Sequence, residues 1–273
     1  MERREQSVEH AGCRLAYTVT GTGPKVLFVQ GVGVHGDGWR PQTDDLSARF
    51  ACLSFDNRGM GKSQPFTPPI TVEQMADDAR AVMDAAGWDA AHVVGHSLGG
   101  LVAVQLALAA RNRVKSLSLL CTFTGSRTAA PMTARMMWLG MRIKIGTRRM
   151  RRRAFLGLVL PPGHTADLDA MADRLAPLYG HDLADSPPVT DHQLKALRAT
   201  DLTPRLGELA GLPTLIVNAA HDPIAPPSAG RALNAGIPGS RYIEVADASH
   251  GWPVTHTEQA NRMLGEHFTA AGG

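Results

Sequence analysis

Cysteine is scarce in this chain of 273 residues, which has only Cys13, Cys52 and Cys121. An odd number of cysteines so far apart does not make the disulfide framework of a small secreted protein. Two of them lie inside apolar, strand-like runs, and we therefore expect reduced, buried thiols in a cytoplasmic protein. The chain also lacks cysteines and histidines clustered at the spacing of metal ligands, so we expect neither a metal nor an organic cofactor.

Long hydrophobic runs are lacking as well. No apolar stretch reaches the ~18 to 20 uninterrupted residues of a membrane-spanning helix. The opening residues, "MERREQSVEH", are charged and are not followed by the apolar run of a signal peptide. We therefore expect no stable membrane insertion and no export.

An excess of one charge is confined to a single segment. The formal net charge is +3, but residues 142–153, "RIKIGTRRMRRR", carry seven basic groups and no acidic one, which leaves −4 for the remainder. A local basic run is not the extended basic face of a nucleic-acid-binding protein, so we expect no nucleic-acid partner. We interpret the run as a solvated helix face rather than as a contact for an anion or a membrane.

The chain does contain an alternation of short β-rich runs with longer helical ones. The β-rich runs are 13–21, 25–31, 51–56, 91–95, 115–123 and 213–219. Most are continuous, which suits strands buried on both faces of a parallel sheet. In the helical run 71–87, Thr71 and Gln74 approximate a capping box and Gly87 suits a C-terminal stop. The alternation predicts an α/β fold with a mostly parallel central sheet and helices on both faces.

The pattern changes after Phe123. Residues 125–200 contain helical runs and two proline pairs but no convincing strand, and strand patterning resumes at Pro213. We interpret 125–200 as a helical cap inserted into one α/β core, which residues 1–124 and 201–273 form. A chain of this length is able to bury one such core.

The segment "AHVVGHSLGGLVAVQ" places a serine, Ser97, between a strand-like run and an apolar helix. A serine at so sharp a turn presents its hydroxyl above the sheet, beside the N-terminus of the next helix. Gly95 and Gly99 flank it and allow the strand and helix to pack closely. Ser97 is therefore the candidate nucleophile. The alternative, a structural turn in which this serine only caps the helix, is disfavoured by the strand before it and the helix after it.

At these residues the chain resembles the α/β-hydrolase family. The sequence "GHSLGG" is similar to the family's nucleophile elbow, and "DNRGMGKS" at 56–63 resembles its D-x-R-G-x-G-x-S turn. The resemblance covers 25–124 and 213–268, with the insertion at the family's cap site, and it implies a serine hydrolase. We interpret Asp56 and Arg58 as structural, because an aspartate at a strand end can hydrogen-bond its own turn.

A catalytic serine needs a histidine base, which is itself oriented by a carboxylate. His250 lies just past a strand-like run, where it resembles the family's catalytic histidine, and we prefer it to His256. Asp222 matches the family's strand-end aspartate, whereas Asp247 lies too close to His250 along the chain. His96 adjoins the nucleophile in sequence, so we expect its side chain to point elsewhere.

Two glycine turns, "QGVG" at 30–33 and "HGDG" at 35–38, follow the first buried run. In this fold the second donor of the oxyanion hole comes from the loop after that strand, so the register selects the first turn. The expected donors are the amides of Val32 and Leu98, with Gln30 and Gly31 supporting the loop. Gln30 stands where the family has the histidine of a His-Gly pair, and it can hydrogen-bond but cannot titrate.

The start of the insertion is rich in methionine, with five of the chain's eleven between Met132 and Met150. Thioether side chains line adaptable pockets and also fill irregular gaps in a core. The candidate pocket residues are Trp39, Met136, Met137, Trp138 and Met141. The residues from the insertion are equally suited to burying the cap against the core.

The sequence thus predicts a serine hydrolase that cleaves an apolar carboxylic ester or lactone through an acyl-enzyme on Ser97. The same residues resemble those of enol-lactonases, C–C bond hydrolases of the β-diketone type, thioesterases and cofactor-free haloperoxidases. A non-catalytic protein that binds a small ligand on the same fold is the alternative from another class.

Overall fold

The computed structural model describes residues 2–125, 133–164 and 167–272. Within these ranges, one eight-stranded sheet has the order β1-β2-β4-β3-β5-β6-β7-β8. The strands are β1 (Arg3–His10), β2 (Cys13–Thr20), β3 (Lys25–Val29), β4 (Ala51–Phe55), β5 (Ala91–His96), β6 (Val114–Leu120), β7 (Thr214–Ala219) and β8 (Arg241–Val245). Strands β3 to β8 pair in parallel, and β1 and β2 add an antiparallel edge. The prediction of a mostly parallel sheet is confirmed.

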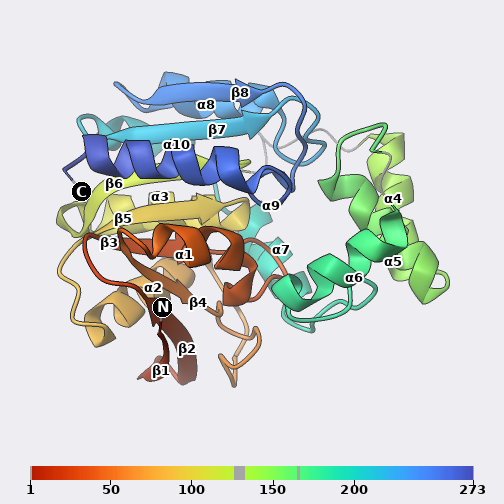
Figure 1. The fold of residues 1–273 in the computed structure, drawn as a ribbon, viewed down its shortest axis with the longest axis horizontal. Coiled ribbons are helices and arrows are strands. Elements are labelled where there is room, and N and C mark those ends of the chain that lie inside the picture. The colour runs from red at the N-terminus through yellow and green to blue at the C-terminus, as the bar shows by residue number, and fades with distance from the viewer. Residues whose placement is uncertain (1, 126–132, 165–166, 273) are drawn as a thin grey trace.

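Helices cover both faces of this sheet (Figure 1). The helices of the core are α1 (Arg40–Leu46), α2 (Val72–Ala85), α3 (Leu98–Ala109), α8 (Pro227–Gly236), α9 (Trp252–Thr255) and α10 (Thr257–Ala270), with the 3-10 turns η1 (Gly36–Trp39), η2 (Arg111–Arg113) and η3 (Thr203–Leu209). Helices α1 and α10 contact each other over one face, and α2 and α3 contact each other over the opposite face. Burial on both sides explains why the parallel strands have continuous apolar sequences.

Two buried clusters join the helices to the sheet. One contains Phe28 of β3 together with Trp39, Leu264 and Phe268 from the α1 and α10 side. The other collects the apolar side chains of α2, α3 and α8 against the opposite face. Burying a large apolar side chain contributes roughly 1.5 to 3 kcal/mol, so these two clusters account for most of the attraction between layers. The three cysteines are free and buried in this core, as predicted.

The ends of α2 form as the sequence predicts. Thr71 Oγ1 accepts a hydrogen bond from Gln74 N at 3.1 Å, which satisfies one of the free amides of the first turn. Gly87 follows the last turn with a φ of +70°, a left-handed conformation in which a side chain would be strained. Helix α2 is therefore capped at both ends, and it packs on α3.

Between β6 and β7, the described residues form four helices and no strand other than an isolated bridge of Gly125 with Asp201. These inserted helices are α4 (Ala134–Lys144), α5 (Arg148–Val159), α6 (Leu168–Tyr179) and α7 (Thr190–Ala199). In Figure 1, α4 to α6 stand beyond the carboxyl ends of the parallel strands. Helices α5 and α6 share a small apolar core of their own. Residues 126–132 of the predicted cap, which include Met132, lie outside the described ranges.

The described helices include none that is both long and apolar enough to cross a lipid bilayer.

Candidate active site

Ser97 occupies the turn between β5 and α3. Its backbone has a φ of 55° and a ψ of −122°, in a region where a residue other than glycine is strained. Strand β6 holds this turn: Ser97 N donates to Leu120 O at 3.0 Å, and Thr122 Oγ1 donates to Ser97 O at 2.6 Å. A strained turn from strand to helix is the geometry that exposes a nucleophilic hydroxyl above a sheet.

Close packing of β5 on α3 explains the glycines on either side of this serine. A Cβ on Gly95 would lie 2.2 Å from Gly99 O, and a Cβ on Gly99 would lie 2.1 Å from Val29 O. No side chain fits at either position without moving the backbone. The reason for glycine predicted from the sequence, close approach of strand and helix, is confirmed.

Asp222 and His250 form a buried hydrogen-bonded pair, with Asp222 just after β7 and His250 between β8 and α9. His250 Nδ1 donates to Asp222 Oδ2 at 2.7 Å, and the two residues are 6% and 4% exposed. The other carboxylate oxygen accepts from the amides of Ile224 and Ala225 at 2.7 and 2.9 Å. Three donors therefore fix the carboxylate. A proton on Nδ1 of His250 leaves its Nε2 free to accept another proton.

The rival residues lie in other surroundings. The side chain of Asp247 is 79% exposed, and its ion-pair partner is His256 at 3.6 Å rather than His250. His256 also contacts Thr255 Oγ1 through Nδ1 at 2.9 Å. Asp222 and His250 are therefore the acid and histidine that the fold brings into contact.

The side chain of His96 packs against His250. The sequence predicted instead that this side chain would point away from the site. Its Nε2 donates to His250 O at 2.9 Å, and the two ring centroids are 4.8 Å apart. Burial lowers the pKa of His96 to about 3, so its ring is neutral at physiological pH and does not act as a base there. It instead holds the backbone of the loop that carries His250. The sequence gives no sign of this contact, because the two residues are 154 positions apart.

The hydroxyl and the two amides that are expected to contact a substrate carbonyl have no hydrogen-bond partner among the described residues. Among the described residues, Ser97 Oγ forms no hydrogen bond, and the amides of Val32 and Leu98 donate none. Leu98 is the first residue of α3, where helical amides lack partners within the helix. Hydrogen bonds between catalytic groups are often long before substrate binds and shorten in the complex.

The first glycine turn lies against the nucleophile turn. A Cβ on Gly31 would be 3.2 Å from the Cβ of Ser97. Gln30 is 5% exposed; its Oε1 accepts from Gly31 N at 3.1 Å, and its carbonyl accepts from Asn57 Nδ2 at 3.0 Å. The turn that the register selected from the sequence therefore lies beside Ser97.

The second glycine turn is tied to Asp56 instead. One carboxylate oxygen of Asp56 accepts from Gly36 N at 2.8 Å, and the other accepts from Lys62 N at 2.9 Å. Arg58, which is 4% exposed, pairs with Asp78 on α2 at 2.6 Å. These contacts fit the structural role that the sequence suggests for Asp56 and Arg58.

Trp39, one of the predicted pocket residues, packs in the core. It is 1% exposed, and its ring centroid is 5.2 Å from that of Phe28. Its ring borders a small cavity of about 30 Å³. The structure therefore gives Trp39 a packing role in place of the wall of an open substrate pocket.

The predicted pocket residues of α4 are exposed. Met137, Trp138 and Met141 are 56%, 54% and 52% exposed, and Met136 is partly buried. Leu139, in contrast, is 5% exposed and anchors the helix. The exposure of these three side chains rules out the interpretation that they bury the insertion against the core.

Known proteins are similar to this chain in both sequence and fold. It is 30% identical over 252 residues to "Putative carbamate hydrolase RutD" of Azorhizobium caulinodans, which covers 92% of this chain and 93% of that protein. The solved enol-lactonase from Burkholderia xenovorans LB400 is 25% identical with a TM-score of 0.81, over 97% of this chain and 100% of the other. "Putative non-heme bromoperoxidase BpoC" from Mycobacterium tuberculosis H37Rv is 27% identical with a TM-score of 0.81, over 95% and 97%.

A family model described as alpha/beta hydrolase fold matches residues 24–256. The matched range contains the serine turn, the strand-end aspartate and the histidine loop described above. The relatives named as hydrolases cover nearly all of the chain. The chain belongs to the α/β-hydrolase family and is a hydrolase.

Proposed function

We propose that this hydrolase cleaves a carboxylic ester or lactone through an acyl-enzyme on Ser97. The observation that carries the proposal is the hydrogen bond of 2.7 Å between His250 and Asp222. The strained serine turn is linked to this pair by His96, the residue before Ser97, which hydrogen-bonds to the His250 carbonyl at 2.9 Å. Serine is a weak nucleophile at neutral pH, and a histidine oriented by a carboxylate is the arrangement that activates it.

In the proposed reaction, Ser97 Oγ attacks the substrate carbonyl while His250 Nε2 takes its proton. Asp222 keeps the proton on Nδ1 and stabilises the imidazolium that forms. The amides of Val32 and Leu98 donate to the oxyanion of the tetrahedral intermediate. The alkoxide leaves with the proton from His250, and a water deprotonated by the same histidine then releases the acid product.

The apolar side chains of α4 support a substrate with an apolar part. We propose that Met136, Met137, Trp138 and Met141 contact it, with the inserted helices acting as a cap. Of the chain's four tryptophans, Trp138 is 54% exposed, whereas the most exposed of the other three is 6% exposed. Quenching or a blue shift of tryptophan fluorescence on adding a non-hydrolysable ester analogue would therefore report on Trp138.

A carbamate is the second candidate substrate, because a relative that covers 92% of this chain is named for it. The same nucleophile and oxyanion donors serve both reactions. The carbamate carbonyl is less electrophilic, because its nitrogen donates electron density to it. An ester or lactone is therefore the better test substrate for the site as built.

We also propose that the protein works in a reducing, cytoplasmic compartment. The three cysteines support this, since all are free and buried in the core. Oxidising compartments favour paired cysteines.

The experiment is a substrate panel assayed with the wild type and with Ser97→Ala. The panel contains p-nitrophenyl esters of increasing acyl length, aliphatic lactones and aryl carbamates. We expect turnover of an ester or lactone in the wild type and its loss in Ser97→Ala. A preference for carbamates would favour the second candidate, and turnover that survives in Ser97→Ala would refute a serine mechanism.

A further inference from the structure

The inserted helices and the segment between them form hydrogen bonds to the proposed oxyanion loop at Gly33. Its N–H donates to Gln193 Oε1 of α7 at 2.9 Å, and its carbonyl accepts from His181 Nε2 at 2.8 Å. Gln193 is fully buried and lies 160 positions along the chain from Gly33. Both backbone groups of the residue after Val32 are thus bound by the insertion rather than by the sheet.

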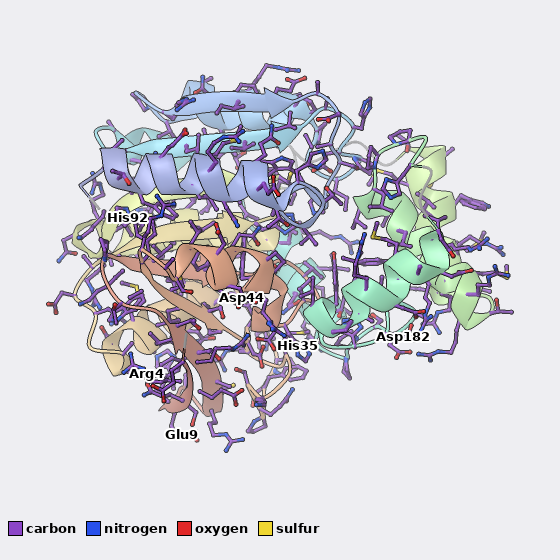
Figure 2. The ribbon with its side chains drawn as sticks, in the orientation of Figure 1. Arg4, Glu9, His35, Asp44, His92 and Asp182 are labelled. Carbon is purple, nitrogen blue, oxygen red and sulfur yellow. The ribbon has the colours of Figure 1, made fainter. Side chains whose placement is uncertain are left out.

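A third contact adds to this grip. His35 N donates to Tyr179 O at the end of α6 at 3.3 Å. A Cβ on Gly180 would lie 2.1 Å from the ring of His35, so the segment after α6 packs directly on this part of the loop. Figure 2 shows His35 on the side of the sheet that faces the inserted helices, and Asp182 among those helices.

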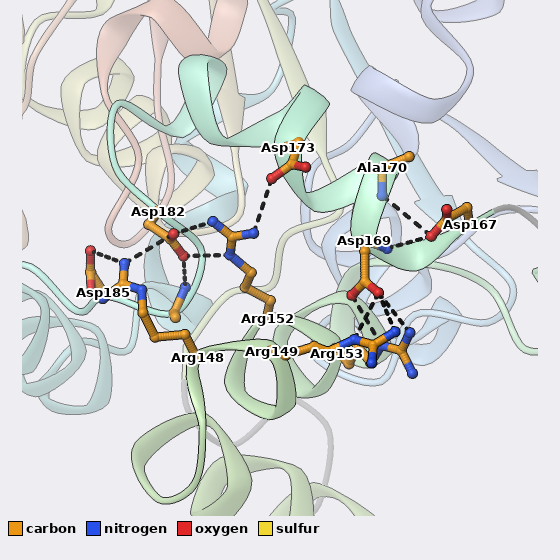
Figure 3. Close-up of polar contacts among 11 residues, drawn as sticks. Arg148, Arg149, Arg152, Arg153, Asp167, Asp169, Ala170, Asp173, Asp182 and Asp185 are labelled. Carbon is orange, nitrogen blue, oxygen red and sulfur yellow. Dashed lines mark hydrogen bonds and ion pairs between the residues drawn. The ribbon is translucent and has the colours of Figure 1, made fainter.

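Arginines of the basic run brace the segment that carries His181. Asp182 accepts from Arg148 at 2.9 Å and from Arg152, and its Oδ1 also accepts from the amide of Ala184 at 2.8 Å (Figure 3). The hydrogen bond from Arg152 and the other donors hold the pKa of Asp182 well below its usual range. The arginines thereby anchor, from α5, the segment from which His181 reaches Gly33.

We propose that Gln193 and His181 are positioning residues that orient the Val32 amide by holding Gly33, so that the oxyanion hole is complete only when the inserted helices are seated. This rests on the proposed function. Gly33 has a φ of +71°, a conformation that the two hydrogen bonds define from both sides. An error of about 1 Å in the position of a donor is enough to weaken catalysis strongly.

The test compares Gln193→Met with Gln193→Glu on one activated ester. Methionine keeps the volume but removes the acceptor for Gly33 N. Glutamate keeps an acceptor oxygen and replaces the Nε2 group, which has no hydrogen-bond partner among the described residues. Because position 193 is fully buried, its neutral, protonated carboxyl is the favoured form there. We expect Gln193→Met to lower kcat by roughly tenfold or more with little change in KM, because an oxyanion donor acts in the transition state. The kcat of Gln193→Glu should be close to that of the wild type.

The matched control is Asp169→Asn. It removes the negative charge and one of the two carboxylate oxygens that pair with Arg149 and Arg153 at 2.7 and 2.8 Å, and so weakens the insertion without touching the loop at 30–35. We expect kcat within about twofold of the wild type for this control. Equal losses in Asp169→Asn and Gln193→Met would overturn the proposal, as would an unchanged kcat in Gln193→Met or a failure of Gln193→Glu to rescue it.

If Gln193→Met does not fold, a second pair of variants, at His181, tests the same proposal. His181→Gln keeps a donor for the Gly33 carbonyl and His181→Leu does not, so kcat should fall in the leucine variant alone. Gln193 is the primary site because both ring nitrogens of His181 face carbonyl oxygens, of Gly33 and Asp182, at 2.8 Å. Wild-type turnover that depends on Ser97 tests the proposed function separately, so the two ideas fail by different results.

Discussion

Gln30 connects the end of β3 to the proposed oxyanion loop through both its side chain and its carbonyl. Its Oε1 accepts from Gly31 N and its backbone oxygen accepts from Asn57, and the side chain is almost fully buried. The family's histidine at this point is replaced here by a group that does not titrate. Support of this loop therefore depends on hydrogen bonding alone.

Gln30→Leu should lower kcat, because it removes that acceptor and leaves the Gly31 amide unpaired at a cost of about 1 to 3 kcal/mol. Gln30→His should keep substantial activity, because a ring nitrogen is able to accept in the same place. His35→Ala keeps the backbone hydrogen bond of His35 with Tyr179 but removes the ring that packs on Gly180, so its effect on kcat should be smaller than that of Gln30→Leu. Side-by-side kcat and KM values on one ester check this. A damaging His35→Ala beside a harmless Gln30→Leu would move the working turn to 35–38.

Ser97, Asp222 and His250 should behave as one unit. Ser97→Ala and His250→Ala are each expected to lower turnover by a factor on the order of 10⁴ or more, and the double variant should be little worse. Asp222→Asn should be somewhat milder. Steady-state kinetics of these variants and of Asp247→Asn provide the measurement. Multiplicative losses in the double variant, or a larger loss in Asp247→Asn than in Asp222→Asn, would show that the residues are misassigned.

Local signals pointed to the residues of the proposed triad but not to the residues that contact them from distant parts of the chain. Ser97 has a glycine-flanked turn, and Asp222 and His250 follow strand-like runs. His96, His181 and Gln193 reach the site through contacts across 154, 148 and 160 positions. Such contacts depend on how the chain is folded, and no spacing in one sequence encodes them.

At the scale of elements, α2 offers the cleanest test of a local sequence signal. Thr71→Ala removes the side chain that accepts from Gln74 N, which should cost about 1 kcal/mol of folding free energy. The midpoint of chemical unfolding should fall while kcat stays unchanged, since α2 carries no proposed catalytic group. Thr71→Ser, which keeps the acceptor, is the control. An unaltered midpoint in Thr71→Ala would show that the cap contributes little.

Buried strands were predictable, whereas the exposed edge strand was not. Strands β3, β4 and β7 fall within the apolar runs identified from the sequence, and β5 extends one residue beyond its run. Strand β1, "RREQSVEH", is mostly exposed and charged because it pairs only with β2 at the sheet edge. An edge strand buries too few side chains to produce an apolar pattern.

The basic run, likewise, is more than a solvated helix face. The run does not form one helix face, because it is divided between the end of α4 and the start of α5, with residues 145–147 between them. Arg148, Arg149, Arg152 and Arg153 of α5 are paired with aspartates of α6 and the segment after it (Figure 3). Those acidic partners lie 16 to 37 positions away along the chain. The basic residues of α5 therefore have no acidic neighbour in the sequence, but acidic side chains lie next to them in the folded structure.

For the whole molecule, buried neutral histidines should make the fold sensitive to mild acid. Burial lowers the pKa of His92 from 6.5 to about 4, and His96 shifts in the same direction. Because the unfolded chain binds these protons first, stability is fully present above pH ~6.5 and falls as the pH drops towards 4. His92 alone should account for about 2 kcal/mol of that loss by pH 4.5.

Thermal unfolding between pH 7.5 and 4.5 measures this loss in the wild type and in His92→Asn, which keeps a polar partner for Ser116. The variant should lose less stability on acidification than the wild type, because its buried side chain does not titrate. Parallel Tm curves for the two proteins would show that His92 does not contribute to the sensitivity to acid.

The acyl-enzyme on Ser97 is the central claim, and peptide mass spectrometry after rapid quenching tests it most directly. The wild type is mixed with an activated ester that it turns over, quenched in acid within the first turnovers, and digested. The predicted result is a mass increase equal to the acyl group on the peptide that contains Ser97, absent from Ser97→Ala. An adduct on another residue, or turnover with no adduct in the wild type and equal turnover in Ser97→Ala, would contradict the account.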